Sequence, residues 1–344
     1  PSQVPASGPA ASARADGSPS ATEAARAAIR YLADHVGDNP ETPWLTWVAF
    51  GACHAPHQAP FNMISKYDSV FAEGWDVERE KRLARQIEMG IVPKKTQLPP
   101  RNDSVRPWTE IAEPERRMFT RLQSAYAAML EHADRHIGRL MQFLETAGQL
   151  EDTLVIVMSD NGASQEGGPF GMINAMGPYN LRRESLDEKI ARIDDIGGPD
   201  THSNFPWGWA MAANTPLRRY KQNTHGGGVR DPLIVHYPKA IQDRGGIRHQ
   251  FHHVSDITPT VLELTGRGCL RGWSQKDIMD LLRTLEGAAL LEASRGEYPT
   301  VGLTRRGEQV AAGTLGVDTL GLRVAPRPAA AARTRKPRRR KRGP

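Results

Sequence analysis

The sequence predicts an α/β fold, and three stretches carry that prediction. Residues 116–147 have apolar side chains at every third or fourth position, which is typical of a helix packed on a core. This helix leads into residues 154–158, five apolar side chains without a polar break, as in a strand buried on both faces. Residues 233–237, apolar except for His236, predict another buried strand. Helices followed by buried strands indicate a sheet covered by helices.

The remaining elements are predicted from periodicity, caps and turn residues. Ser20 and Glu23 have the spacing of a capping box, which opens an amphipathic helix that continues to about Val36. A strand is expected at residues 44–50, before a loop that contains two prolines. Further helices are expected at residues 75–89, 181–193, 252–266 and 277–291.

The two ends of the chain differ in composition from its middle. Residues 1–19 are rich in Pro, Ala, Ser and Gly, so we expect a disordered lead-in there. Residues 20–266 contain the regular patterns of a folded domain, whereas residues 267–304 show no clear assignment. Residues 305–344 lack apolar periodicity and are expected to form a disordered basic tail.

The formal net charge of +6 comes from that tail. Eight Lys and Arg residues and no acidic ones lie within residues 333–342, so the rest of the chain has a net charge of −2. No apolar run is long enough for a membrane helix, so no membrane partner is expected. No signal peptide is recognised either, and the sequence does not predict a cellular compartment. Cys53 and Cys269 permit at most one disulfide.

The basic tail predicts weak binding to polyanions, but no specific nucleic-acid partner, since it has no interleaved aromatic residues. Because counterion release drives such contacts, retention on DNA should fall steeply as salt is raised. Deleting residues 333–344 should abolish the retention. Equal retention by the full and the shortened chain would show that the tail is not the binding segment.

A candidate cation site follows the first predicted strand. That strand ends in Ser159-Asp160-Asn161-Gly162, and in open α/β sheets ligands bind beyond the carboxyl ends of the strands. Asp160 and Asn161 would present a carboxylate and an amide oxygen there, which are ligands that calcium or magnesium prefers. Taken alone, the stretch is better explained as a plain turn.

Two other loops contain residues suited to chemistry. His54 and His57 lie in a Pro-rich loop after the predicted strand at 44–50, and from this segment alone they could also be surface or capping residues. Lys221 and His225 precede three consecutive glycines, Gly226 to Gly228, which allow the backbone to approach a ligand closely. A solvated surface lysine is the alternative for Lys221.

Four stretches, taken together and in this order, resemble the sulfatase family: residues 52–60, 154–163, 221–237 and 253–266. Several pairs and triplets between residues 66 and 101, among them Gly74-Trp75-Asp76, are similar to the bacterial arylsulfatase subgroup. The resemblance covers residues 20–266. It implies an alkaline-phosphatase-like fold, a mixed sheet between helical layers, and a parent protein in the bacterial cytoplasm or periplasm.

The resemblance also implies a chemistry. The family hydrolyses small-molecule sulfate esters with a divalent cation, usually calcium, and a formylglycine made from Cys or Ser. By position in the motifs, Asp160 and Asn161 correspond to metal ligands and Lys221 to the lysine that contacts the sulfate. His54 corresponds to the histidine near the leaving-group oxygen, a natural general acid, with His57 as the alternative.

The sequence departs from the family at three places. Gly226 stands where many relatives have Glu, and the Asp-Asp pair that the family uses for its metal is absent. The nucleophile motif, Cys/Ser-x-Pro/Ala-x-Arg, is also absent, since neither Cys53 nor Cys269 is followed by it. Residues 20–266 therefore resemble a partial catalytic domain, incomplete at the N-terminus and inactive alone. A metal-dependent phosphoesterase of the same superfamily, or a non-catalytic remnant with a polyanion-binding tail, are the alternatives.

Overall fold

The computed structural model describes residues 20–40, 42–264, 275–293, 301–311 and 314–315. The chain divides into two compact units, one of residues 7–249 and one that contains residues 250–344 with the first six residues. The lead-in at residues 1–19 lies outside the described part, as do residues 265–274, with Cys269, and residues 316–344 of the tail.

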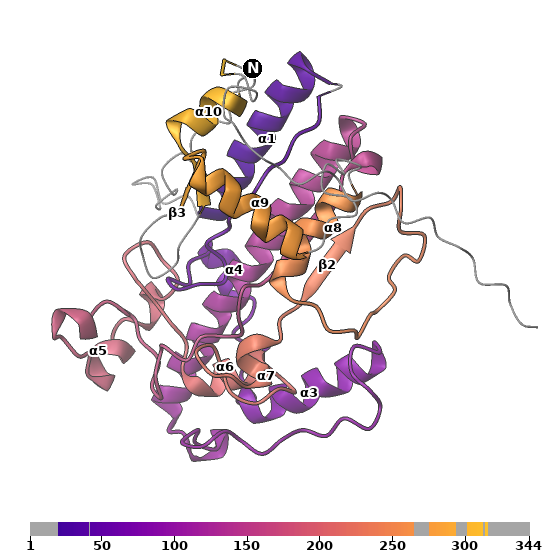
Figure 1. Ribbon diagram of the computed structural model, residues 1–344. Coiled ribbons are helices and arrows are strands. Elements are labelled where there is room, and N and C mark those ends of the chain that lie inside the picture. Colours follow the sequence, from indigo (N-terminus) through magenta and orange to yellow (C-terminus); the bar gives the residue numbers. More distant parts are fainter. Residues whose placement is uncertain (1–19, 41, 265–274, 294–300, 312–313, 316–344) are drawn as a thin grey trace, which may run out of the picture. The chain divides into compact units, whose positions relative to one another are not determined.

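The first unit is mainly helical (Figure 1). Its two strands are β1 (Val155–Met158) and β2 (Leu233–His236). Its α-helices are α1 (Ser20–Asp38), α2 (Phe61–Ser65), α3 (Gly74–Glu88), α4 (Glu113–Thr146), α5 (Leu186–Ile190), α6 (Trp207–Ala213) and α7 (Gly226–Val229). Short 3-10 helices lie at Trp108–Glu110, Leu150–Asp152, Pro178–Asn180 and Ile193–Asp195.

The long helix α4 organises this unit. The first half of its apolar stripe is buried, Met118, Phe119 and Leu122 completely, whereas Leu130 is exposed; α1 and α2 pack against this helix (Figure 1). Next to it, Trp75 contacts both Trp108 and Trp209 edge to face, with ring centroids 4.7 and 5.8 Å away. Trp209 is thus a core residue. The helices predicted at residues 20–36, 75–89 and 116–147 are confirmed as α1, α3 and α4.

The sheet differs from the expectation. β1 and β2 pair antiparallel, with Val157 opposite Ile234. In the described residues of this unit no further strand joins them, so a mixed sheet between helical layers is not seen. Both strands were also expected to be buried on both faces, and this prediction is wrong. Because no further described strand lies beside them, the two-stranded ribbon of β1 and β2 is half-exposed, and Ile234 is 62% exposed. The strand predicted at residues 44–50 is also wrong; the segment is irregular.

One predicted helix is shorter than expected. Of residues 181–193, only Leu186–Ile190 are α-helical. Leu181 has a left-handed backbone, φ 57°, which a right-handed helix cannot include. The helix starts instead at a capping box, in which the Ser185 hydroxyl accepts from the Glu188 N–H and the Glu188 carboxylate accepts from the Ser185 N–H.

The second unit contains short elements. A 3-10 turn, Val254–Asp256, leads into α8 (Ile257–Leu264), in agreement with the helix predicted at 252–266. Helix α9 (Gln275–Gly287) is followed by β3 (Leu291–Ala293), which pairs antiparallel with β4 (Val301–Leu303). The predicted helix at 277–291 thus ends earlier than expected. Residues 305–344 were expected to be disordered, yet α10 (Arg305–Ala311) is helical.

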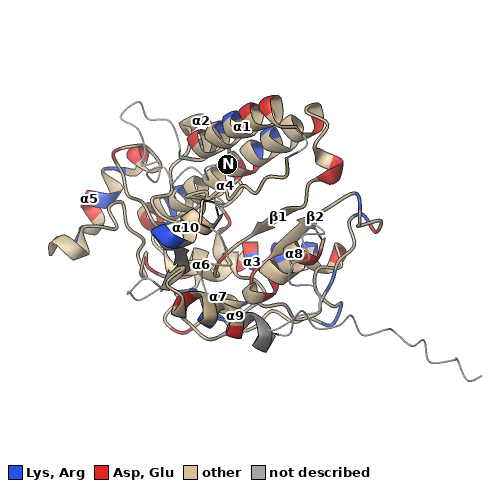
Figure 2. Ribbon diagram, turned by 45° about the horizontal axis from the view of Figure 1, so that its top comes forward, with Lys and Arg blue, Asp and Glu red and all other residues tan. Residues whose placement is uncertain are grey.

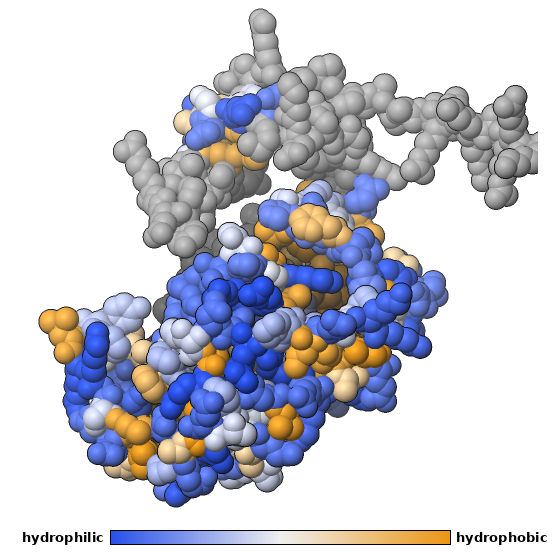
Figure 3. Space-filling model, turned by 90° about the horizontal axis from the view of Figure 1, so that it is seen from below, coloured by the Kyte–Doolittle hydropathy of each residue, from blue (hydrophilic) through white to orange (hydrophobic). Residues whose placement is uncertain are grey.

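The described surface is that of a mixed-charge protein. Basic and acidic residues are interspersed over helices such as α1 (Figure 2), consistent with a body whose charge is near neutral. On the face shown in Figure 3 hydrophilic side chains predominate and apolar ones form separate small patches. Among the helices described here, none is both long and apolar enough to span a bilayer.

Candidate functional site

Backbone contacts hold two loops of the first unit together at the end of β1. The turn after β1 contains Asp160 and Asn161, and the next two residues bind the loop that precedes β2. Gly162 N–H donates to the Gly228 carbonyl at 3.3 Å, and the Ala163 carbonyl accepts from Lys221 N–H at 3.0 Å. Lys221 therefore lies beside the Asp-Asn turn although about sixty residues separate them in the sequence.

The close approach of these loops depends on glycines and on one asparagine. A Cβ added at Gly162 would lie 1.8 Å from the Gly227 carbonyl oxygen. Asn214 fixes the arrangement, because its Oδ1 accepts from Ala163 N–H at 2.9 Å and its Nδ2 donates to the Arg219 carbonyl at 3.0 Å. The glycine run predicts such an approach, whereas nothing in the sequence indicated Asn214.

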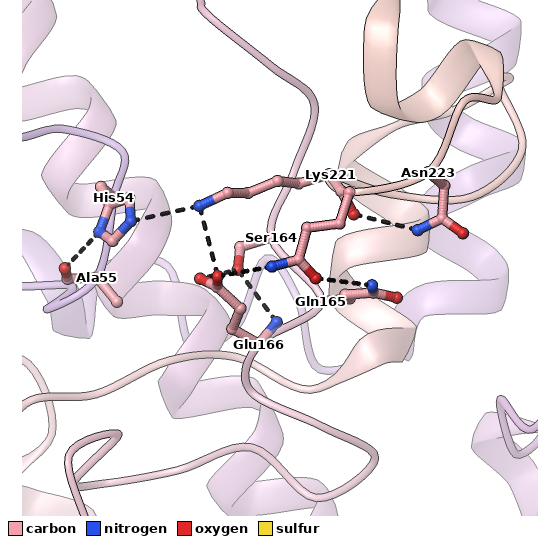
Figure 4. Close-up of polar contacts among 8 residues, drawn as sticks. His54, Ala55, Ser164, Gln165, Glu166, Lys221 and Asn223 are labelled. Carbon is pink, nitrogen blue, oxygen red and sulfur yellow. Dashed lines mark hydrogen bonds and ion pairs between the residues drawn. The ribbon is translucent and has the colours of Figure 1, made fainter. Parts of the chain in front are cut away.

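Lys221 is the centre of the polar cluster drawn in Figure 4. Its Nζ lies 3.5 Å from Nε2 of His54 and 3.5 Å from Oε1 of Glu166. The Lys221 side chain is only 22% exposed, although its head group faces these polar partners. The structure thus brings together Lys221 and His54, which come from loops 167 positions apart.

The contacts of His54 indicate its tautomer. Nδ1 lies 2.7 Å from the carbonyl oxygen of Ala55, an acceptor only, so Nδ1 carries the hydrogen. Nε2 is then a bare nitrogen that accepts from the Lys221 ammonium. His54 is exposed, so its Nε2 edge can exchange Lys221 for a proton or a ligand.

Glu166 was missed by the sequence reasoning. Its Oε2 accepts from the Ser164 hydroxyl at 3.0 Å, and its Oε1 accepts from Gln222 Nε2 at 3.2 Å (Figure 4). These bonds hold the carboxylate toward Lys221. Because Gln222 lies in the Lys221 loop, the contact depends on the folding of the chain; the only signal in the sequence was an acidic residue six positions after Asp160.

Asp160 and Asn161 lie directly past the end of β1, with Asp160 exposed and Asn161 half-buried. The Ser159 hydroxyl donates to the Asn161 carbonyl at 2.9 Å, which shapes the turn. Asp231 lies near this turn, because the Ser159 N–H donates to the carbonyl of the following residue, Pro232, at 3.4 Å. Burial and then the charge of Asp160 raise the pKa of the Asp231 carboxyl group.

The oxygen donors at this place fit a hard divalent cation, because a cation near Asp160 and Asp231 would relieve the repulsion between their carboxylates. Asn161, the residue after Asp160, has an amide oxygen of the same ligand type. Within the described ranges, however, no group of three or more His, Cys, Asp or Glu side chains surrounds a common point. The described protein ligands are therefore fewer than the six to eight that calcium takes.

His57 has a structural position. It is 1% exposed and lies between Tyr126 and Phe205, with ring centroids 5.1 and 4.9 Å away. Burial first, and then the charge of His54, lower its pKa to about 3. A buried, neutral imidazole cannot protonate a leaving group at an exposed site, so the geometry favours His54 over His57 for that role.

Two other residues of these loops are also unsuited to direct chemistry. Burial raises the pKa of the Cys53 thiol, which a hydrogen bond with Tyr126 only partly offsets, so the reactive thiolate is disfavoured. His225 is exposed and precedes α7, and the described hydrogen bonds do not attach its side chain to the Lys221 cluster.

Comparison with known proteins gives consistent results. The Sulfatase family profile matches residues 7–267. An uncharacterized sulfatase of Schizosaccharomyces pombe is 35% identical over 226 residues, which cover 64% of this chain and 39% of the yeast protein. An arylsulfatase of Klebsiella aerogenes is 26% identical over 259 residues, 75% of this chain and 53% of the enzyme. A steryl-sulfatase of Mus musculus is 28% identical over 177 residues, 52% of this chain and 22% of the enzyme.

Proposed function

Because this chain belongs to the sulfatase family, we propose that the cluster around Lys221 binds the sulfate group of a small-molecule sulfate ester and serves its hydrolysis. The observation that carries the proposal is the meeting of Lys221 Nζ and His54 Nε2 at 3.5 Å, beside the turn that contains Asp160 and Asn161. The chain spans 39% and 53% of its yeast and Klebsiella relatives, so the activity of a whole protein of this kind is part of the proposal.

Lys221 supplies the charge that recognises the sulfate. An ammonium group on a flexible stem can meet a tetrahedral oxyanion from several directions. The Lys221 side chain is mostly buried and its ammonium faces Glu166 and His54, so a sulfate that binds there takes the place of these contacts. As negative charge grows on the sulfate during hydrolysis, the same ammonium stabilises it.

His54 transfers a proton to the leaving group. In the free site its Nε2 accepts from Lys221; once the ammonium has turned to the sulfate, Nε2 can take up a proton. When the sulfur–oxygen bond of the ester breaks, the departing alcohol oxygen receives that proton from Nε2, and His54 returns to its neutral form. The Nδ1–H bond to the Ala55 carbonyl keeps the ring oriented throughout.

Asp160 and Asn161 would hold the divalent cation, with Asp231 nearby. Bound there, calcium or magnesium would supply further positive charge to the sulfate oxygens. The family's formylglycine has no precursor motif in this sequence. The residues of this chain therefore account for sulfate binding and proton transfer, and the attack on sulfur is left to a nucleophile that it does not provide.

We accordingly expect the 344-residue chain to bind inorganic sulfate but not to turn over aryl sulfates. Lys221→Met, which keeps the apolar stem, should weaken sulfate binding at least tenfold, since it removes the only cation among the residues of Figure 4. An NMR titration with sodium sulfate at fixed ionic strength measures the affinity. Equal affinity of the wild-type and Lys221→Met chains would contradict the proposal.

The turnover half of this prediction is checked with a chromogenic aryl sulfate. Hydrolysis that survives repurification of the wild-type chain and disappears in His54→Ala would show that a nucleophile is present after all. A trace contaminant, in contrast, would be unaffected by the substitution.

A further inference from the structure

We propose that Glu166 is an internal counter-ion that occupies Lys221 in the free site and must release it before sulfate can bind. The proposal rests on the function proposed above and concerns the control of the same site. It identifies Glu166 as a positioning residue that lowers the affinity for anions, since its carboxylate takes the place that a sulfate oxygen would take at the ammonium.

The geometry of the free site supports this competition. Lys221 Nζ is 3.5 Å from Glu166 Oε1 on one side and 3.5 Å from His54 Nε2 on the other (Figure 4). A sulfate that binds the ammonium would therefore lie close to the Glu166 carboxylate, which already contacts the same ammonium. Like charges at such separations repel, and each anion competes for the same N–H donors.

Glu166 is held in its place independently of Lys221. Its Oε2 accepts from the Ser164 hydroxyl, its Oε1 accepts from Gln222 Nε2, and its own backbone N–H donates to Ser164 Oγ at 3.1 Å. Lys221, with its long stem, is the more mobile partner. When sulfate binds, we expect the ammonium to move from Glu166 to the anion while the carboxylate remains with Ser164 and Gln222.

The same exchange would free His54. In the resting contact the Lys221 ammonium donates to Nε2 of His54. Withdrawal of the ammonium toward sulfate leaves Nε2 of His54 without this contact and free to face the bound ester. Glu166 would therefore couple the arrival of the sulfate to the release of His54 from Lys221.

The test compares sulfate affinities by NMR titration at fixed ionic strength. Glu166→Gln keeps the shape of the side chain and, through its single amide oxygen, one of the two hydrogen bonds accepted from Ser164 and Gln222, but it removes the charge. It should bind sulfate about three- to tenfold more tightly than the wild type, as expected for loss of one like charge about 4 Å away when solvent screening is close to that of bulk water. The gain should vanish when Lys221→Met is added.

Glu88→Gln is the matched control. Glu88 forms an exposed surface pair with Arg85 at 2.7 Å on α3, so its substitution changes the net charge equally without touching Lys221. Its affinity should stay within about 1.5-fold of the wild type. If Glu166→Gln behaves like Glu88→Gln while Lys221→Met still loses binding, this inference is overturned and the proposed function stands. If no chain shows Lys221-dependent sulfate binding, both are overturned.

Discussion

Lowering the pH from 7 to 5 is expected to reduce the free energy of unfolding of the first unit by about 2 kcal/mol through His57 alone. The pKa of this buried imidazole is about 3 in the folded chain, against an ordinary value of 6.5. Burial is the main cause, and the positive charges that His54 and His202 would carry add to it, against a hydrogen bond with the Cys53 backbone that acts in the opposite direction.

The sign follows from which state binds more protons. Between pH 6.5 and about 3 the unfolded chain has His57 protonated while the folded chain keeps it neutral, so acid favours unfolding. Stability is therefore complete above pH 6.5 and falls progressively below it. The pKa values of His132 and His136, between α1 and α4, are lowered by burial as well, so these residues add to the loss with the same sign.

Chemical denaturation at a series of pH values measures this effect. His57→Gln stays neutral at every pH, so its stability should vary less between pH 7 and pH 5 whatever its absolute value. His249→Gln, at an exposed position, is the control and should keep the wild-type pH dependence. Identical slopes for the His57→Gln and wild-type chains would show that His57 does not control acid stability.

His57 also connects acid stability to the candidate site. The backbone N–H of His57 donates to the Ser203 carbonyl at 3.0 Å, and the Ser203 hydroxyl donates to the His57 carbonyl at 2.9 Å. These two bonds anchor the loop that contains His54. A protonated ring would no longer be stable in this buried position, and its movement toward water should break these bonds and loosen His54 before the whole unit unfolds, which an NMR signal of the His54 ring would report.

Gly162→Ala is expected to lower the free energy of unfolding by about 3 kcal/mol and to abolish sulfate binding by the Lys221 cluster. The added Cβ would lie 1.8 Å from the Gly227 carbonyl oxygen and 3.2 Å from Asn214 Oδ1. A backbone carbonyl cannot rotate aside as a side chain can. The turn that contains Asp160 and Asn161 must therefore move away from the Lys221 loop.

Gly138→Ala provides the comparison for this substitution. Gly138 lies inside α4, where an added Cβ meets nothing within 4 Å, so alanine should stabilise the helix by about 0.5–1 kcal/mol. Thermal unfolding and sulfate titration of both variants check the pair. A Gly162→Ala chain that unfolds and binds like the wild type would show that the two loops are not packed as closely as described.

The sequence by itself determined the long amphipathic helix, the strand that lies just before Asp160 and Asn161, and the family. Helix α4 was predictable because its apolar stripe is a local, periodic signal that extends over many turns. The family was predictable because four motifs occur in the right order, and the family profile confirms it over residues 7–267. The roles of His54, Lys221, Asp160 and Asn161 were assigned by position in those motifs and stay predictions.

Only the tertiary structure decided which residues touch. Nothing local distinguishes His54, which is exposed beside Lys221, from His57, which is buried three residues later, because burial depends on Tyr126 and Phe205 from distant segments. Glu166 reaches Lys221 only because Gly162 allows two loops to meet. The strand pairing was also beyond the sequence, since an apolar run fixes neither its partner nor its direction, and β1 and β2 turned out antiparallel and half-exposed.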